Sequence, residues 1–186
     1  LDEAIASGEF YSLGLGNPIA VSAAHGDRIS ALMDDILSDF IEEEDEAEAE
    51  DEDDLDEADR EVRIAVVGRP NVGKSTLLNY ILGQKLSITS KKPQTTRHQL
   101  LGIKTSEKEQ VLYVDTPGIH GKENKAINRY MNKSAKSIVK DVDVVVFVTD
   151  RTEWQDDDEI TADSLRNAPG QIIIAINKID LLKDKE

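Results

Sequence analysis

Residues 68–76 constrain the fold of this chain more than any other stretch. They read Gly-Arg-Pro-Asn-Val-Gly-Lys-Ser-Thr, with two glycines five positions apart and a lysine and a serine after the second. A largely apolar run precedes them at 62–67, and a stretch with helical spacing follows at 76–82. A strand, a glycine-rich turn and a helix in this order point backbone N–H groups and a helix N-terminus at one spot, which favours an anion. The pattern predicts a P-loop at Gly68–Ser75, because a mere turn needs neither the lysine nor the serine.

Each part of this motif has an expected role. Lys74 would reach the β- and γ-phosphates of a nucleotide, and the Ser75 hydroxyl would ligate Mg²⁺. Asp115 follows a second apolar run, where a carboxylate can hold Mg²⁺ through water, and Gly118 lets the backbone approach a γ-phosphate closely. The predicted phosphate-binding residues are Gly68, Arg69, Pro70, Asn71, Val72, Gly73, Lys74, Ser75, Thr76 and Gly118.

A second motif, Asn177-Lys178-Ile179-Asp180, selects the base. It follows the apolar run 172–176, so we expect it at the end of a strand. An aspartate there can accept hydrogen bonds from both N1–H and the 2-amino group of guanine, whereas adenine offers no such donors. We therefore expect GTP rather than ATP, with Asn177, Lys178 and Asp180 as guanine-binding residues.

Strands and helices alternate through the second part of the chain. We expect strands at 62–67, 100–105, 111–114, 144–148 and 172–176, and helices at 75–82, 126–140 and 157–167. The runs 144–148 and 172–176 are continuously apolar, as in central strands that are covered on both faces. This alternation predicts a doubly wound α/β fold with a mostly parallel sheet, which binds ligands at the C-terminal ends of its strands.

The net charge of -16 is concentrated in one segment. Residues 42–61 hold 15 acidic residues and one basic residue, so they carry -14 of the total. Such a block predicts a disordered linker, and an acidic tail that docks on a basic partner is the alternative. Cysteine is absent, which excludes disulfides, and no apolar run approaches the roughly 18 residues of a membrane span. The three histidines are scattered, which indicates surface or turn positions.

The first 41 residues read as helix, strand and helix. Apolar residues from Ile29 onward fall on one helical face, and Pro18–Ser22 is a short strand candidate. A single helix of this length is marginal in water, and 41 residues are too few to build a core of their own. The segment therefore needs a partner surface.

Residues 62–186 resemble the G domain of the Era family, bacterial GTPases of small-subunit ribosome assembly. The resemblance rests on the motifs at 68–76, 83–90, 93–98, 115–120 and 177–180. It implies GTP or GDP and Mg²⁺ as cofactors, the small ribosomal subunit or its RNA as partner, and a cytoplasmic location that leaves peripheral binding to the inner membrane open. The family's RNA-binding KH domain is not expected within this chain.

The same resemblance implies a switch threonine, Thr95 or Thr96, that closes on Mg²⁺ and the γ-phosphate; the family pattern favours Thr96. Ile119 occupies the place of a water-positioning glutamine, so we expect slow intrinsic hydrolysis that needs a partner, a switch rearrangement or a monovalent cation. Asn71 resembles a K⁺-binding asparagine, and capping of the loop is its alternative role. Lys74, Thr96 and Asn71 are thus the catalytic candidates. The competing class is a guanine-nucleotide-binding or interaction fragment without turnover.

Residues 9–60 instead resemble Der, a family of GTPases with two G domains in tandem. The stretches 9–16 and 19–26 are similar to the end of its first G domain, and the acidic run to its interdomain linker. This resemblance makes Ser22, Ala23 and Ala24 the fifth G-domain motif, whose backbone contacts guanine. We therefore predict a circularly permuted G domain, with residues 1–41 supplying its last elements, 42–61 the linker and 62–186 the rest. A tandem fragment whose halves do not assemble and a domain-swapped dimer are the alternatives.

Overall fold

The computed structural model describes residues 10–47, 61–85, 100–105, 110–119, 126–150 and 154–182. Its strands are β1(Pro18–Ala20), β2(Val62–Val67), β3(Leu100–Thr105), β4(Gln110–Asp115), β5(Val144–Asp150) and β6(Gln171–Asn177). Its helices are α2(Ile29–Ala47), α3(Lys74–Leu82), α4(Ala126–Ile138) and α5(Asp156–Leu165), with 3-10 turns η1(Phe10–Leu13) and η2(Ile179–Leu181).

The described strands form one six-stranded sheet in the order β1-β6-β5-β2-β4-β3. Four of the five neighbouring pairs are parallel, and β3 runs antiparallel to β4. Only residues 106–109 join β3 to β4, and a connection this short allows an antiparallel pair but no crossover. The predicted α/β fold with a mostly parallel sheet is confirmed.

The first and last strands of the described chain are neighbours in this sheet. β1 lies at the edge beside β6, with Pro18 paired to Ile174 and Ala20 to Ile176. The ladder continues past β1, because the Val21 N–H donates to the Ile176 carbonyl at 2.8 Å. Residues from the N-terminal segment therefore reach the same edge of the sheet as the end of β6.

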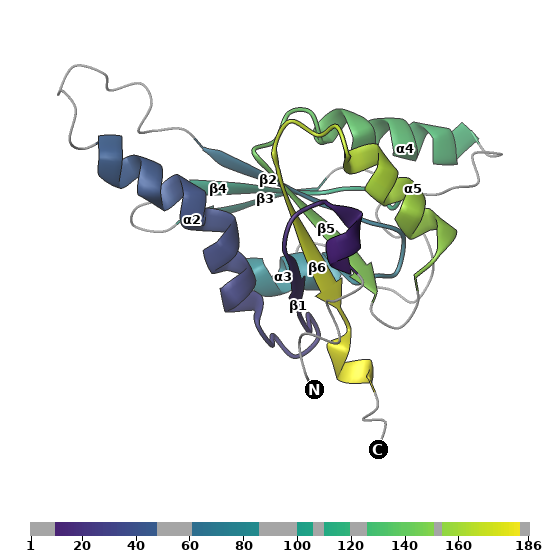
Figure 1. Ribbon diagram of the computed structural model, residues 1–186, viewed down its shortest axis with the longest axis horizontal. Helices are drawn as coiled ribbons and strands as arrows, with labels where there is room; N and C mark the ends of the chain where they lie inside the picture. Colours follow the sequence, from purple (N-terminus) through teal and green to yellow (C-terminus); the bar gives the residue numbers. More distant parts are fainter. Residues whose placement is uncertain are drawn as a thin grey trace.

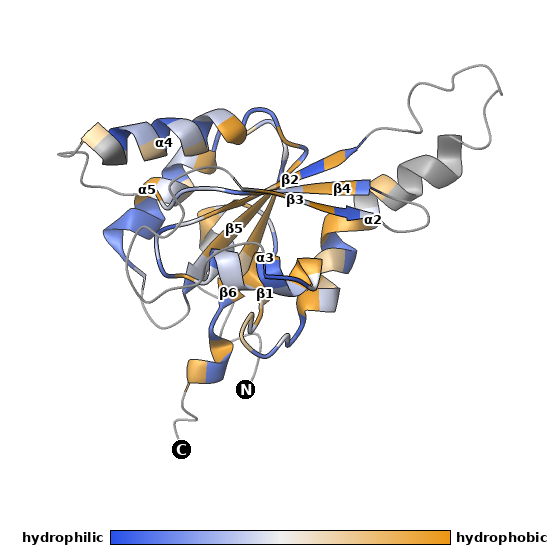
Figure 2. Cartoon of the chain, turned by 180° about the vertical axis from the view of Figure 1, so that it is seen from behind, coloured by the Kyte–Doolittle hydropathy of each residue, from blue (hydrophilic) through white to orange (hydrophobic). Residues whose placement is uncertain are grey.

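Helices cover both faces of the sheet (Figure 1). α2 and α3 lie on one face, where Leu32 and Ile36 of α2 are fully buried together with Leu77 of α3. α4 and α5 lie on the other face, and η1 packs there too through Phe10. The strands between them are the most apolar part of the molecule (Figure 2), and every residue of β5 is buried.

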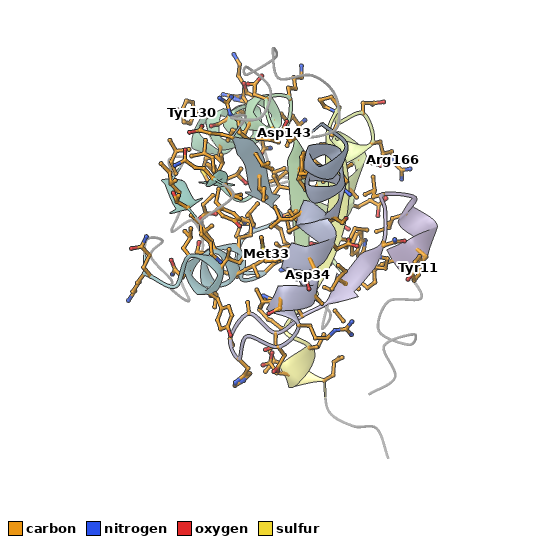
Figure 3. All side chains as sticks on the ribbon, turned by 90° about the vertical axis from the view of Figure 1, so that its left-hand side faces the viewer. Tyr11, Met33, Asp34, Tyr130, Asp143 and Arg166 are labelled. Atoms are coloured by element: carbon orange, nitrogen blue, oxygen red, sulfur yellow. The ribbon has the colours of Figure 1, made fainter. Side chains whose placement is uncertain are left out.

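Helix α2 packs through one side only. Met33 is half-buried and accepts a hydrogen bond from the Tyr113 hydroxyl of β4 at 3.7 Å, while Asp34 is exposed (Figure 3). The described part of the helix runs to Ala47, six residues beyond the boundary predicted at residue 41, and residues 48–60 of the predicted linker lie outside the described residues. Glu and Ala are strong helix formers, which favours this extension of the helix. None of the described helices has both the length and the apolar character that crossing a membrane requires.

Candidate functional site

The predicted phosphate loop connects β2 to α3 through three residues with positive φ. These are Gly68 at 148°, Asn71 at 64° and Gly73 at 102°. A Cβ on Gly68 would lie 2.2 Å from the Val148 carbonyl oxygen, and one on Gly73 would lie 2.2 Å from Asn177 Nδ2. The two glycines therefore allow the loop to lie directly against the ends of β5 and β6.

Lys74 opens α3 and is held beneath this loop. Its Nζ donates to the carbonyl oxygens of Gly68 and Arg69, at 2.9 Å each, and the residue is 7% exposed. Burial lowers the pKa of Lys74 to about 8, an effect that Asp115 opposes and Arg69 strengthens. Lys74 is thus a cation that is largely shielded from water, and a bound anion would stabilise its charged form.

Two oxygen-bearing side chains lie next to each other beside the loop. Ser75, in the first turn of α3, donates its hydroxyl to Asp115 Oδ2 at 3.0 Å. Asp115 ends β4 and is fully buried. A hydroxyl and a carboxylate oxygen at this separation fit the oxygen ligands that Mg²⁺ prefers. The predicted third ligand, Thr96, and its alternative Thr95 lie outside the described residues.

The segment that follows β4 packs against the start of the loop. The Ile119 N–H donates to the Gly68 carbonyl at 3.3 Å, and a Cβ on Gly118 would lie 2.7 Å from Cγ of Pro70. Ile119 is 1% exposed. The side chain in the place of the expected glutamine is therefore buried as well as apolar.

Asn177 connects the predicted guanine motif to two other segments. Its Oδ1 accepts a hydrogen bond from the Ala23 N–H at 2.9 Å, and its Nδ2 donates to the Val72 carbonyl at 2.8 Å. Asp180 lies in η2 and its Oδ1 accepts the Ser22 hydroxyl at 2.6 Å. The fold thus joins the phosphate loop, residues 22–23 and residues 177–180 within one chain.

Ala24 and His25 lie next to these contacts. Ala24 follows in the exposed turn after Ala23. His25 places Nε2 3.9 Å from Asp180 Oδ2, with a side chain that is 63% exposed. The sequence predicted a surface or turn position for this histidine, and its exposure agrees with that. Its proximity to Asp180 could not be predicted from the neighbouring residues, because it depends on the pairing of β1 with β6.

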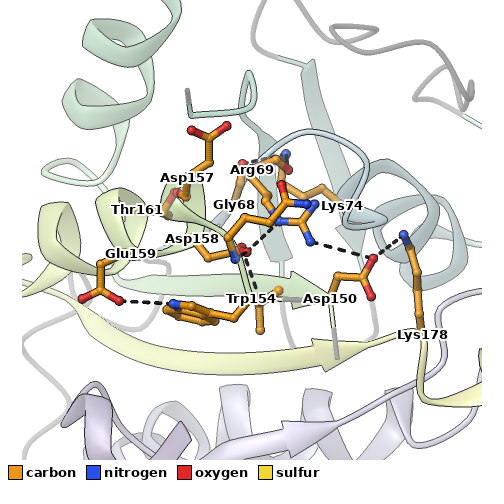
Figure 4. A network of polar contacts seen from close by, with 12 residues as sticks. Gly68, Arg69, Lys74, Asp150, Trp154, Asp157, Asp158, Glu159, Thr161 and Lys178 are labelled. Atoms are coloured by element: carbon orange, nitrogen blue, oxygen red, sulfur yellow. Dashed lines mark hydrogen bonds and ion pairs between the residues drawn. The ribbon is translucent and has the colours of Figure 1, made fainter. Parts of the chain in front are cut away.

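Two carboxylates that no motif marks engage predicted site residues (Figure 4). Arg69 Nε donates to Asp158 Oδ2 at 2.6 Å, and Lys178 Nζ donates to Asp150 Oδ2 at 2.6 Å. Asp158 lies in the first turn of α5, and Asp150 ends β5. The sequence offered one reason to consider Asp150 as a site residue, because it follows a predicted strand and ligands of parallel α/β sheets bind where strands end.

The loop between β2 and α3, the carboxylate after β4 and the Asn-Lys-x-Asp motif after β6 all lie at the C-terminal ends of parallel strands. This arrangement is the α/β P-loop GTPase fold. Residues 63–178 match the model of a family described as 50S ribosome-binding GTPase, and the chain belongs to this family.

Several relatives of similar sequence are GTPases named Era. The GTPase Era of Ectopseudomonas mendocina is 62% identical over 122 residues, and that of Azotobacter vinelandii is 61% identical. Each match covers 66% of this chain and 41% of the relative. The chain therefore spans about two fifths of the length of these relatives.

Two solved Era structures share the fold. A variant of Aquifex aeolicus Era bound to GDP and AlF4⁻ is 40% identical, with a TM-score of 0.60, over 66% of this chain and 42% of that one. An Era complex with MgGDPNP and a segment of 16S ribosomal RNA is 41% identical, with a TM-score of 0.60, over 65% of this chain and 41% of that one.

Proposed function

We propose that this chain binds GTP and GDP together with Mg²⁺ and hydrolyses GTP as a molecular switch. The observation that carries the proposal is the Asn177 side chain, which joins the phosphate loop at Val72 to the predicted fifth motif at Ala23. Beside it, Asp180 presents a carboxylate suited to the two N–H donors of guanine. The Era structures solved with guanine nucleotides support the same assignment.

The proposed chemistry is transfer of the γ-phosphoryl group to water. Lys74 and the N–H groups of the loop would neutralise phosphate charge, and Ser75 with Asp115 would hold Mg²⁺, with Thr96 closing on it. Bound Mg²⁺ supplies charge neutralisation at the β- and γ-phosphates. Ile119 offers no hydrogen bond to the attacking water, so we expect slow intrinsic turnover. Asn71 is exposed and left-handed, which suits both a K⁺ ligand and a loop cap.

We further propose that the N-terminal segment completes a circularly permuted G domain in cis. The pairing of β1 with β6, the packing of α2 beside α3 and the hydrogen bonds of residues 22–23 support this arrangement. The division into 1–41, 42–61 and 62–186, and the Der-like origin of residues 9–60, belong to the same proposal. A domain-swapped dimer would make the same contacts between two copies.

Ribosomal RNA is the partner that the relatives suggest. One solved Era binds a segment of 16S ribosomal RNA, while the family description names the 50S subunit. We favour the small subunit, because the relatives at about 60% identity are Era proteins. The alternative function is a nucleotide-binding or interaction fragment that does not hydrolyse GTP.

The test combines nucleotide binding with turnover. Fluorescent GDP binding, competition by GTP and ATP, and phosphate release would be measured on the full chain and on Lys74→Ala. We expect GTP but not ATP to compete, slow phosphate release, and loss of both activities in the variant. Binding without phosphate release would select the non-hydrolysing alternative, and a chain that binds no guanine nucleotide would contradict the proposal.

A further inference from the structure

Asp150 connects the two ends of the predicted nucleotide site through one carboxylate oxygen. Its Oδ2 accepts a hydrogen bond from Lys178 Nζ at 2.6 Å and lies 4.0 Å from Arg69 Nη2 (Figure 4). Lys178 belongs to the guanine motif, and Arg69 is the second residue of the phosphate loop. The Asp150 side chain is 7% exposed, so water screens these contacts little.

The phosphate loop is therefore attached to the guanine motif at two points. Asn177 binds the loop directly through the Val72 carbonyl. Lys178, the next residue, is linked to the loop through Asp150 and Arg69. Two attachments restrict the loop more than one does, because they hold it at two different residues, Val72 and Arg69.

The Arg69 side chain has a second anchor that does not depend on Asp150. Its Nε pairs with Asp158, which is fully buried and also accepts hydrogen bonds from the Gln155 N–H at 3.0 Å and the Thr149 hydroxyl at 3.3 Å. These bonds fix Asp158 in place. Arg69 therefore keeps a charged partner when Asp150 is neutralised, and the buried arginine does not become an unpaired charge.

We propose that Asp150 is a positioning residue of the nucleotide site, which orients Lys178 toward the base and holds the start of the phosphate loop through Arg69. The proposal rests on the proposed guanine-nucleotide binding. An opposing effect makes it testable: Asp150 is an anion near the site of bound phosphates, so pure electrostatics predicts that its removal strengthens binding. A positioning role predicts instead that removal of the Asp150 charge weakens nucleotide binding.

The first experiment is Asp150→Asn, which keeps the shape of the side chain and removes its charge. Lys178 is 31% exposed and Arg69 retains Asp158, so we expect the variant to fold. GDP affinity, measured by titration of fluorescent GDP with Mg²⁺, should fall about tenfold with the loss of charge-assisted bonds. Unchanged or tighter GDP binding would overturn the proposal.

A double-mutant cycle tests whether Asp150 acts through Lys178. In a Lys178→Met background the effect of Asp150→Asn should shrink to about twofold or less, since the bond to Lys178 is already gone and only the longer contact with Arg69, at 4.0 Å, remains. The same tenfold loss in both backgrounds would overturn the proposed route. A chain that binds no GDP in its natural form would instead refute the proposed function, so the two failures are distinguishable.

A matched control and a second variant complete the design. Asp163→Asn removes a carboxylate of α5 that pairs with Arg166 at 3.0 Å on the exposed surface, and GDP affinity should not change. If Asp150→Asn does not fold, Asp150→Glu keeps the charge but moves the oxygen by one methylene group. A positioning role predicts weaker GDP binding for this variant, and natural affinity would contradict the role.

Discussion

Lys74 combines two properties that suit a phosphate ligand. Both of its hydrogen bonds go to carbonyl oxygens of the loop in which it begins α3, and burial lowers its pKa to about 8. The ammonium group is therefore held in place before any nucleotide arrives, but its charge is only partly compensated. A phosphate group would supply the missing countercharge and raise the pKa again.

This shift predicts that GDP affinity falls with rising pH. Below pH 8 the free protein already carries the Lys74 proton, whereas above pH 8 binding must take it up, so affinity should fall by up to about tenfold per pH unit. GDP titrations between pH 7 and 9 would measure the slope. Calorimetry in buffers of different ionisation enthalpy would measure the proton uptake, and a flat profile without uptake would contradict the assignment.

The contact between Gly73 and Asn177 gives a second prediction. In Gly73→Ala, a Cβ would lie 2.2 Å from Asn177 Nδ2 at a φ of 102°, so the bridge to residues 22–23 must shift. We expect GDP affinity to fall at least tenfold and the free energy of unfolding to drop by about 1–3 kcal/mol. Gly83→Ala is the control, because Gly83 also has positive φ but its Cβ would meet nothing within 4 Å. Equal effects on GDP affinity would show that the Gly73 contact is irrelevant.

At the scale of elements, the side-chain pattern predicts strand centres better than strand ends. The apolar run 144–148 predicts the middle of β5, but the strand continues through Thr149 and Asp150, which pair with Ile176 and Asn177 of β6. Strand pairing uses backbone groups, so the polar side chains of these two residues do not indicate that they belong to a strand. For this reason Asp150, which engages Lys178, was not predicted as a site residue.

Helix α2 offers a prediction on whether the N-terminal segment is part of the fold. Leu32 is fully buried in the cluster that also contains residues of α3 and the sheet. Leu32→Ala should lower the free energy of unfolding by about 2–5 kcal/mol. Urea denaturation would measure it, with Ser30→Ala on the exposed side of α2 as control. A change below about 0.5 kcal/mol, as at an ordinary surface position, would mean that α2 does not pack in solution.

For the whole molecule, motif spacing predicted candidate residues of the site but not how they contact one another. The phosphate loop and the Asn-Lys-x-Asp motif were recognisable because their chemistry depends on local spacing. The hydrogen bonds from Ser22 to Asp180 and from Ala23 to Asn177 join residues 158 and 154 positions apart, and only the sheet order brings them together. Resemblance to G-domain ends suggested this pairing, whereas residue patterns alone could not.

Deletion of residues 1–60 tests the permuted arrangement. Without β1 and α2 the edge of β6 and the apolar face beside α3 are exposed, and residues 22–23 are missing. The shortened chain should therefore melt at a lower temperature and lose measurable GDP binding. Thermal melting and fluorescent GDP titration against the full chain would decide, because unchanged values would refute the proposal. Light scattering would separate folding within one chain from a swapped dimer, which has twice the mass.

The short edge strand β1 has a thermodynamic consequence. It spans three residues, and the segment after it carries part of the predicted guanine site, so release of this strand would dismantle the site. A ligand that binds only the docked form stabilises it, by about 2.7 kcal/mol at one hundred times its dissociation constant. Guanine nucleotide should therefore slow hydrogen exchange at the Val21 amide, which donates to Ile176. By linkage, whatever pulls the N-terminal segment away would expel the nucleotide.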